Sequence, residues 1–384
     1  MREVYLDTAA TAVYTSVDEV IINEIARSMR EYWMNPSSLY ATDVRDKIDE
    51  CRANIAKFIG AKTDEIYFTS GASESNNWAL RGFCDEVFDK TDDWAYIITT
   101  KIEHKSILNY VEDINSRAEA AYCKVDKFGL VDLSDLERLL NEHDSLPTLV
   151  SVAIANNEIG TIQDIKRISD LVHEYGGFLH VDATQILGKT QINVETLGID
   201  MLSASGHKIS PVLKGIGFLY KNNDVNIKPL IYGAQEKNLR GGTENTFGII
   251  GLSKAIEYCD VSVETVEETI KLRDYFINQL ETKFGCKLNG HPDYRLSNNI
   301  SVTFPQNITG EALLYTLDLD GMKISTGSAC NSKEIKQSHV LQMIGLTKEE
   351  SIKTIRISIP NDITYDVIDK VVLEIGKSIK LIEN

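Results

Sequence analysis

The stretch IKRISDLVHEYGGFLHVDATQ, residues 165–185, contains the pattern that indicates the fold class most directly. Its first half, 165–176, repeats apolar residues at helical spacing and ends in glycine, as helices often do. Its second half begins with GFLHVD at 177–182, a short apolar run that indicates a buried strand. Asp182 is the last residue of that strand, and Gln185 follows three residues later. A helix followed by a buried strand is the repeating unit of α/β proteins with a mostly parallel sheet.

The same alternation extends over the first two thirds of the chain. Further buried strands are expected at EIYFTS (65–70), WAYIIT (94–99), TLVSVAIA (148–155), MLSAS (201–205) and GIGFLY (215–220). Beyond residue 246 the pattern predicts a long helical stretch through 284, LSNNISVTF (296–304), a helix around 309–319, TIRISI (354–359) and a terminal helix from about 364. We therefore expect a large α/β domain at 16–258. A smaller α+β domain is expected at 259–384, to which residues 1–15 return.

Composition excludes several classes of function. Of the 384 residues, 43% are hydrophobic and 25% are charged, as in ordinary soluble globular proteins. The net charge of −17 argues against binding of nucleic acid as the main function. The chain has no apolar run long enough to span a membrane, and MREVYLDTAA lacks the apolar core of a signal peptide. The six cysteines show no metal-binding spacing, so we expect a cytoplasmic protein with free thiols and no metal site.

A glycine- and hydroxyl-rich stretch, GASESNN at 71–77, follows the strand expected at 65–70. Free amides and the positive dipole end at the start of a helix favour a phosphate group. A well-capped helix is an equally compatible interpretation of this stretch alone. Neither GxxxxGK[ST] nor GxGxxG is present, so a nucleotide is not indicated.

Three residues with useful chemistry stand at or after the ends of other expected strands: His104, Asp182 and Lys208. Taken singly, each has a structural interpretation, as a capping or core histidine, a helix N-cap and a solvated lysine. Together with the phosphate site they are the parts that a pyridoxal phosphate site requires. The lysine amine forms a Schiff base, the carboxylate keeps the pyridine nitrogen protonated, and the histidine ring can stack on the cofactor and move protons.

The chain resembles the cysteine desulfurases of the bacterial IscS/NifS group, which are class V aminotransferase-type enzymes that use pyridoxal phosphate. The resemblance rests on VYLDTAAT (4–11), NPSS (35–38), FTSGASESNN (68–77), EHKS (103–106), NNEIGTIQDI (156–165), HVDATQ (180–185), SGHK (205–208), RGGTEN (240–245), STGSAC (325–330), SHVL (338–341) and IRIS (355–358). Their common order and spacing make the signal specific. The resemblance implies fold type I, with a mostly parallel seven-stranded sheet in the large domain.

The resemblance also implies a set of site residues, carried over motif by motif. Lys208 forms the Schiff base, Asp182 pairs with the pyridine nitrogen, Gln185 contacts the ring oxygen, and His104 stacks on the ring. The phosphate is held by Ala72, Ser73, Ser205 and His207 and, from the other subunit of a homodimer, by Thr243. Asn157 contacts the cofactor and, with Arg356, binds the carboxylate of the substrate L-cysteine.

Cys330 stands alone in the polar stretch ISTGSACNSK (324–333) and is the implied sulfur acceptor. Its thiolate takes the sulfur of L-cysteine as a persulfide, and L-alanine is released. His104 is the candidate acceptor for the thiol proton. Gly327, Ser328 and Ala329 give the segment the small size that sulfur delivery requires. The expected recipients are sulfur-acceptor proteins for iron–sulfur cluster assembly or thiolation.

Two other functions stay open on the sequence alone. A selenocysteine lyase or an aminotransferase could use the same scaffold, and an aminotransferase would not depend on Cys330. A non-catalytic sulfur-relay scaffold is a different class, and such a protein would be colourless and would take up no pyridoxal phosphate.

Overall fold

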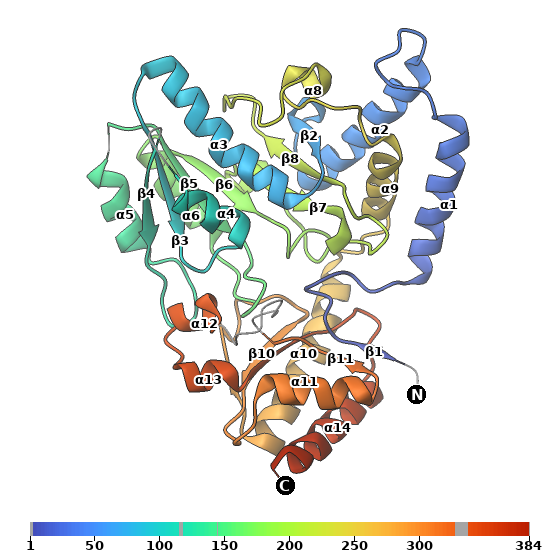
Figure 1. Cartoon of the computed structure of the whole chain (residues 1–384), viewed down its shortest axis with the longest axis vertical. Coiled ribbons are helices and arrows are strands. Elements are labelled where there is room, and N and C mark those ends of the chain that lie inside the picture. The colour runs from blue at the N-terminus through green and yellow to red at the C-terminus, as the bar shows by residue number, and fades with distance from the viewer. Residues whose placement is uncertain (1–2, 115–117, 144, 327–336, 384) are drawn as a thin grey trace.

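A seven-stranded sheet forms the centre of the larger part of the molecule in this computed structural model (Figure 1). The structure describes residues 3–114, 118–143, 145–326 and 337–383. The sheet consists, in spatial order, of β2 (Ile66–Thr69), β8 (Gly217–Lys221), β7 (Met201–Ser205), β6 (Phe178–Asp182), β5 (Thr148–Ala153), β3 (Ala95–Thr100) and β4 (Ala118–Cys123). Strand β8 is antiparallel to both neighbours, and the other pairs are parallel. The expectation of a mostly parallel sheet is therefore confirmed.

Alternate residues of the central strands point to opposite faces of the sheet, and both faces are apolar. Ile98 and Leu179 belong to the core on one face, whereas Ile97 and Leu149 belong to the core on the other. Side chains alternate along a strand, so a strand that is buried on both sides must be apolar throughout. This explains why the strand sequences are short continuous apolar runs.

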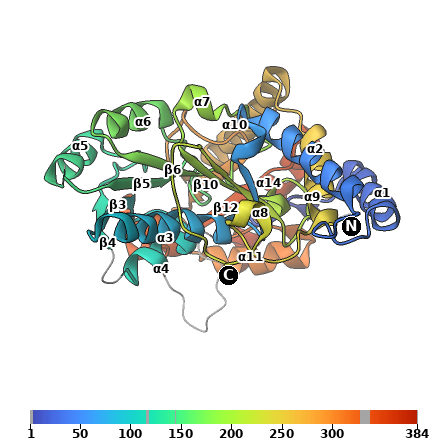
Figure 2. The ribbon, with the colours of Figure 1, turned by 90° about the horizontal axis from the view of Figure 1, so that it is seen from above.

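Helices cover both faces of this sheet (Figure 2). One face carries α3 (Ala72–Thr91) and α4 (Lys105–Glu112). The opposite face carries α2 (Thr42–Ile59), α5 (Leu133–Glu142), α6 (Ile165–Glu174) and α9 (Thr246–Glu257), with α1 (Ser16–Glu31) packed on α9. Two short helices, α7 (Val194–Leu197) and α8 (Gln235–Asn238), lie in connecting segments. This two-sided covering leaves the strand ends as the place for a site.

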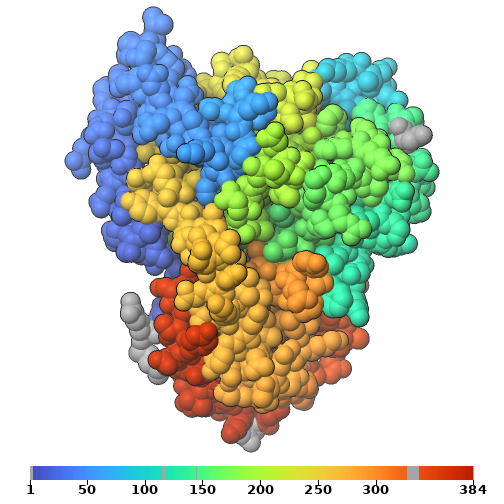
Figure 3. All heavy atoms as spheres, turned by 180° about the vertical axis from the view of Figure 1, so that it is seen from behind, coloured from blue at the N-terminus to red at the C-terminus, as the bar shows by residue number. Residues whose placement is uncertain are grey.

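The rest of the chain builds a second core below the first one in Figure 1. Its strands are β9 (Lys287–Leu288), β10 (Asn299–Thr303) and β12 (Thr354–Ser358), which pair antiparallel, and β1 (Val4–Tyr5) with β11 (Met322–Lys323), which pair parallel. Its helices are α10 (Val263–Phe284), α11 (Gly310–Leu319), α12 (His339–Met343), α13 (Lys348–Ile352) and α14 (Tyr365–Glu383). Leu6 packs in this second core, so the N-terminal strand lies with the C-terminal part. From behind, the two parts form one continuous surface (Figure 3).

Two local features differ from the sequence-based expectation. Strand β4 was not expected, because its sequence AEAAYC forms an edge strand with a half-buried middle and lacks a continuous apolar run. The long helical stretch through 284 is two helices, α9 and α10, separated at residues 258–262. The domain boundary at residues 258 and 259 stays a prediction. Within the described residues, no helix combines the length and hydrophobicity needed to span a bilayer.

Candidate active site

The carboxyl ends of four neighbouring strands bring the predicted residues together. Strand β6 ends at Asp182 and β7 at Ser205, while His104 follows β3 and Asn157 follows β5. These four strands are parallel neighbours, so their carboxyl ends share one edge of the sheet, where α/β proteins bind ligands.

Asp182 lies in a network of hydrogen bonds that reaches His104. Its Oδ1 accepts from the Thr184 amide at 2.9 Å, and its Oδ2 accepts from Asn76 Nδ2 at 2.8 Å. Asn76 Nδ2 also donates to Ser106 Oγ at 2.9 Å, and this oxygen is 2.8 Å from His104 Nδ1. Sequence reasoning assigned no role to Asn76. Asn76 could have been suspected from the sequence, because it is one helical turn after Ala72 and so lies on the same face of α3 as the predicted anion site.

His104 is the N-cap of α4, and this fixes its ring. Nδ1 accepts a hydrogen bond from the Ser106 amide at 3.1 Å, so the proton of the neutral ring is on Nε2. Desolvation by the surrounding protein lowers the pKa of His104, although nearby Asp182 acts in the opposite direction. The neutral ring is therefore favoured, and it donates from Nε2.

Lys208 ends a short turn after β7, and its amine is held by the N-terminal segment. Nζ donates to the carbonyl oxygens of Ala9 at 2.6 Å and Ala10 at 2.7 Å. Burial, helped by the charge of Arg356, lowers the pKa of Lys208 to about 8. A usable fraction of this amine is consequently neutral near physiological pH, as a nucleophile or base requires.

The predicted phosphate site is a cradle at the start of α3. Gly71 precedes the helix with a φ of 148°, and a Cβ on Gly71 would lie 3.3 Å from Ser205 Oγ. Ser205 Oγ is in turn 2.8 Å from His207 Nδ1. The first amides of a helix have no partner within the helix, so Ala72 and Ser73 present donors to an anion here.

Arg356, on β12 of the second core, faces Asn157 and the N-terminal strand. Its Nη2 donates to Asp7 Oδ1 at 2.7 Å, and its Nη1 donates to the Asn157 carbonyl at 3.1 Å. Its Nε is buried and has no hydrogen-bond partner in the described part of the chain. One donor of a buried guanidinium thus stays available for a carboxylate ligand. Asp7 was not predicted as a partner, because it lies 349 positions before Arg356.

Buried polar atoms around Asp182 test whether a polar cofactor fits this site. Asn76 Oδ1, Thr184 Oγ1 and Gln185 Oε1 are buried and lack hydrogen-bond partners among the described residues. Buried polar groups are nearly always satisfied in folded proteins. Asn76 and Thr184 bond to Asp182, and Gln185 shares the Ala9 carbonyl with Lys208. The unsatisfied atoms therefore fit a polar ligand near Asp182 and Lys208, such as the pyridine ring of pyridoxal phosphate.

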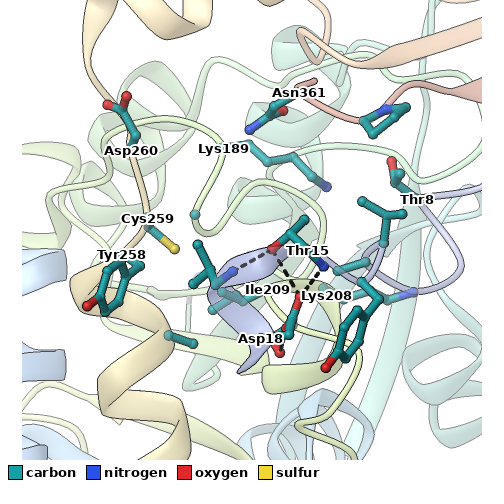
Figure 4. A pocket seen from close by; sticks show the side chains of 18 of the residues that line it. Thr8, Thr15, Asp18, Lys189, Lys208, Ile209, Tyr258, Cys259, Asp260 and Asn361 are labelled. Atoms are coloured by element: carbon teal, nitrogen blue, oxygen red, sulfur yellow. Dashed lines mark hydrogen bonds between the residues drawn. The ribbon is translucent and has the colours of Figure 1, made fainter. Parts of the chain in front are cut away.

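A pocket of about 710 Å³ adjoins Lys208 between the start of α1, the end of α9 and residues 359–362 (Figure 4). Lys189 also lines it, and Lys189 Nζ donates to the Gln185 carbonyl at 2.5 Å. Gln185 Nε2 shares the Ala9 carbonyl with Lys208, at 3.1 Å. Burial lowers the pKa of Lys189 to about 7, with contributions from Lys208 and Arg356. Lys189 is a second amine at this site that sequence reasoning missed.

One predicted residue, Thr243, lies apart from this cluster, and another, Cys330, cannot be placed relative to it. Thr243 is exposed and lines a pocket of about 190 Å³ with Ser70 and Arg240. Cys330 lies outside the described residues, but both flanks of its segment are placed. The Ser325 amide donates to the Arg356 carbonyl at 3.0 Å, and the Arg356 amide donates to the Ser325 carbonyl at 2.7 Å. On the other flank, Ser338 Oγ donates to the buried carboxylate of Glu158.

The five cysteines in the described residues are poorly suited to nucleophilic chemistry. Burial raises the thiol pKa of each one, to about 11 or 12. They are Cys51, Cys84, Cys123, Cys259 and Cys286. A thiol with such a pKa is almost entirely protonated at neutral pH.

Comparison with known proteins agrees with this geometry. The Aminotransferase class-V family matches residues 4–371. Cysteine desulfurase IscS of Dictyoglomus turgidum is 41% identical over 386 residues, which cover 97% of this chain and 95% of the relative. A solved NifS-like protein has a TM-score of 0.88 and 34% identity, covering 99% of this chain and 100% of that one. A structure of SspA in complex with cysteine has a TM-score of 0.78 and 32% identity, with 93% and 99% covered. The chain therefore belongs to the aminotransferase class-V family of pyridoxal-phosphate-dependent enzymes, among the proteins similar to IscS and NifS.

Proposed function

We propose that this protein is a cysteine desulfurase that converts L-cysteine to L-alanine and transfers the sulfur to Cys330. The observation that carries the proposal is the position of Ser325. This residue pairs with the backbone of Arg356, so the segment that bears Cys330 begins beside the proposed carboxylate site. The cysteine desulfurase and cysteine-bound relatives support the choice of substrate.

Arg356 and Asn157 bind the substrate carboxylate in this proposal. The free Nε of Arg356 and its adjacent Nη2 form one edge of a planar fork that matches two carboxylate oxygens. Asp7 holds Nη2 and the Asn157 carbonyl holds Nη1, so the guanidinium is already oriented before substrate arrives. A preoriented guanidinium lowers the entropic cost of binding.

The cofactor would be held by residues at the strand ends of the large sheet and at the start of α3. Lys208 attaches it, Asp182 pairs with its ring nitrogen, Gln185 contacts its ring oxygen and His104 stacks on the ring. Its phosphate contacts Ala72, Ser73, Ser205 and His207, with Thr243 supplied by the partner subunit. When bound, pyridoxal phosphate supplies an electron sink for the charge that develops at the substrate Cα.

Lys208 moves the substrate proton, and His104 donates a hydrogen bond. The Lys208 amine removes the Cα proton, which requires its neutral form, and a pKa of about 8 makes that form accessible. The sequence suggested His104 as the acceptor of the Cys330 proton. The hydrogen bond from the Ser106 amide to Nδ1 instead leaves the ring proton on Nε2, so neutral His104 can orient a partner by donating a hydrogen bond from Nε2 but has no free nitrogen for the thiol proton.

Cys330 takes the sulfur. Its thiolate attacks the sulfur atom of the bound cysteine, so a sulfur–sulfur bond forms and the carbon–sulfur bond breaks. The electron pair of the broken bond stays with the carbon, which is then protonated to give L-alanine. Cys330 is five positions after Ser325, so an extended chain gives it a reach of at most about 17 Å from that anchor. This reach covers the neighbouring carboxylate site.

Exposed apolar side chains support a homodimer, in which Thr243 can cross between subunits. Leu39 is 91% exposed, Tyr40 76%, Trp33 70% and Tyr232 79%. The loop after α1, which carries three of them, and α8, which follows Tyr232, lie at the same end of the molecule (Figure 1). Large exposed apolar residues mark interaction surfaces. We further assign the protein to the cytoplasm, with persulfide sulfur passed to acceptor proteins for iron–sulfur assembly or thiolation.

Replacing Cys330 with serine tests the function. The Cys330→Ser variant should fold, bind pyridoxal phosphate and change its absorbance when cysteine is added, because the residues around Asp182 and Lys208 are intact. It should release no L-alanine, and mass spectrometry should detect no extra sulfur on the protein. Cys259→Ser is the matched control and should keep turnover and form the persulfide.

Each of the other outcomes points to another function. Full desulfuration by Cys330→Ser, or extra sulfur mapped to another cysteine, would refute the proposal. Transamination that does not depend on Cys330 would indicate an aminotransferase. A clear preference for selenocysteine would indicate a lyase, and a colourless protein without cofactor uptake would indicate a scaffold.

A further inference from the structure

A strained turn stands next to the phosphate cradle. Glu236, Lys237 and Asn238 have φ values of 45°, 60° and 66°, so three consecutive residues other than glycine are left-handed. Each side chain in this conformation brings Cβ close to its own backbone, which is unfavourable for L-residues. Such strain persists only where surrounding contacts hold it, and it is concentrated at functional sites.

The Arg52–Glu236 ion pair holds this turn against the central sheet. Arg52 Nη1 and Nη2 donate to the two Glu236 oxygens at 2.7 and 3.0 Å, and the two side chains are 11% and 3% exposed. Glu236 Oε2 also accepts from the Phe68 amide at 3.0 Å, and Arg52 Nη1 donates to the Ile66 carbonyl at 2.7 Å. Strand β2 is an edge strand, so the pair satisfies the backbone groups that a further strand would otherwise bind.

The same loop is fixed a few residues further along. A Cβ on Gly241 would lie 2.2 Å from the Tyr232 carbonyl oxygen, so the two arms of the loop touch backbone to backbone. Gln235 Oε1 accepts from the Gly242 amide at 3.0 Å. Arg240 donates to Glu74, in the first turn of α3, at 2.8 and 3.2 Å. Thr243 is three residues after Arg240 and is exposed.

An unsatisfied polar group lies beside Thr243. Glu244 Oε2 is buried and has no hydrogen-bond partner within the described residues. Glu244 and Thr243 line the same pocket as Arg240 and Glu236. An unpaired buried carboxylate oxygen in a polar pocket indicates that this surface is completed by a further group, as an interface with a second subunit would provide.

We propose that Arg52 and Glu236 are positioning residues for Thr243, whose hydroxyl they orient toward the cofactor phosphate of the partner subunit. The inference rests on the cross-subunit role of Thr243 proposed above. Neither residue belongs to the set proposed to hold the cofactor. The pair holds a strained turn in one conformation, and the loop passes that orientation to residues 240–243.

A double-mutant cycle on pyridoxal phosphate affinity tests the coupling. The probe is pyridoxal phosphate itself, titrated into cofactor-free protein and followed by intrinsic fluorescence. Thr243→Val removes one hydrogen bond to a charged group and should raise the Kd roughly ten- to a hundredfold. Arg52→Lys keeps the charge but loses the two-pronged geometry, and we expect a Kd about three- to tenfold higher. The double variant should have the Kd of Thr243→Val alone, because Arg52 acts only through Thr243.

Three control variants separate positioning from general destabilisation. Leu280→Ala empties a fully buried position in the second core and should lower Tm while leaving the Kd for pyridoxal phosphate unchanged. Arg138→Lys alters the ion pairs of an exposed arginine with Asp135 and Glu142 and should leave the Kd unchanged. Lys237→Gly with Asn238→Gly relieves the left-handed strain, so Tm should rise by a few degrees, whereas the loosened turn should raise the Kd as Arg52→Lys does.

Each result decides for or against the proposal. A Kd in the double variant that multiplies the two single effects would overturn the positioning role while leaving Thr243 in place. An unchanged Kd in Thr243→Val would overturn both the cross-subunit contact and the inference that depends on it. If Arg52→Lys does not fold, Glu236→Gln replaces it in the same cycle with the same expected outcome.

Discussion

At the scale of single residues, the reactivity of the site depends on the pKa of Lys208, which its neighbours shift in opposite directions. Burial and Arg356 lower the pKa of Lys208, whereas Asp7 and Asp182 raise it. The result is an amine that is held in place by two carbonyl groups and still loses its proton readily. The surroundings, more than the lysine itself, decide its reactivity.

The titration of Lys208 can be measured in cofactor-free protein. The rate of labelling by a small amine-reactive reagent should rise with a midpoint near pH 8, against about 10.4 for ordinary exposed lysines. Asp182→Asn removes a negative charge and should lower the midpoint, while Arg356→Gln removes a positive charge and should raise it. Peptide mass spectrometry, with labelling carried out at pH values from about 6 to about 11 so that both midpoints are covered, identifies the labelled lysine and gives its midpoint. A midpoint near that of exposed lysines would contradict this account of the site.

Arg356 should control substrate affinity more than the chemical step. Arg356→Gln removes a charged partner from the substrate carboxylate, so KM for cysteine should rise roughly ten- to a hundredfold, with a smaller effect on kcat. Asp7→Asn leaves the guanidinium but weakens its orientation, so its effect on KM should be in the same direction and smaller. Steady-state kinetics of alanine release measure both. An unchanged KM in Arg356→Gln would place the carboxylate site elsewhere.

At the scale of elements, a buried carboxyl group joins two strands just before the site. Glu103 accepts from Thr100 Oγ1 at the end of β3 and from the Ala153 amide at the end of β5, both at 2.7 Å. Burial raises the pKa of Glu103 to about 8. A group whose pKa is raised by folding stabilises the fold below its unfolded pKa, and this contribution is lost as pH rises through the folded value. The contribution of Glu103 to the free energy of unfolding should therefore fall as the pH rises from about 4.5 to about 8.

Glu103→Gln isolates this effect. The glutamine amide can accept from the Ala153 amide through its oxygen and donate through its NH2 to Thr100 Oγ1, which turns from donor to acceptor, and it does not titrate. The Tm of the variant should exceed that of the native protein by an amount that grows from pH 5 to pH 8. For a chain of this size the difference should reach roughly a few degrees. Thermal unfolding at a series of pH values measures it. Glu103→Leu, which loses both hydrogen bonds, should be less stable at every pH, and a pH-independent difference for Glu103→Gln would contradict the raised pKa.

At the scale of the whole molecule, the proposed dimer predicts that each cofactor site uses residues from both subunits. In a mixed dimer of one Lys208→Ala subunit and one Thr243→Val subunit, a cross-subunit Thr243 leaves one site intact. The other site then carries both defects. Half of the sites should bind pyridoxal phosphate with native affinity. If Thr243 served its own subunit, both sites would be defective.

Two affinity tags, one on each subunit, allow purification of the mixed dimer. Titration with pyridoxal phosphate then counts native-affinity sites, and the two parent homodimers serve as controls with none. A monomeric protein in solution, measured by light scattering, would contradict the dimer itself.

Local sequence patterns predicted the α/β class, the chain positions of the strands of the large sheet other than β4, and the candidate residues at strand ends, while the family resemblance supplied the other proposed site residues. These features are local. A strand that is buried on both faces must be a continuous apolar run, and a residue that ends such a strand must lie at the ligand-binding edge of the sheet. Asp182, Ser205 and His104 could be found for that reason. Strand β4 could not, because an edge strand with a half-buried middle leaves no such run.

Contacts between distant residues, and the changes in their chemistry, became visible in the folded chain and not in the sequence. Asn76 contacts Asp182 across 106 positions, and Arg356 contacts Asp7 across 349. No local pattern marks such pairs, since each partner is an ordinary polar residue until the chain brings it into contact. The lowered pKa of Lys208 and the strained turn held by Arg52 and Glu236 have the same origin. Burial and long-range charge exist only in the folded chain, so the sequence could name the reactive groups but not their reactivity.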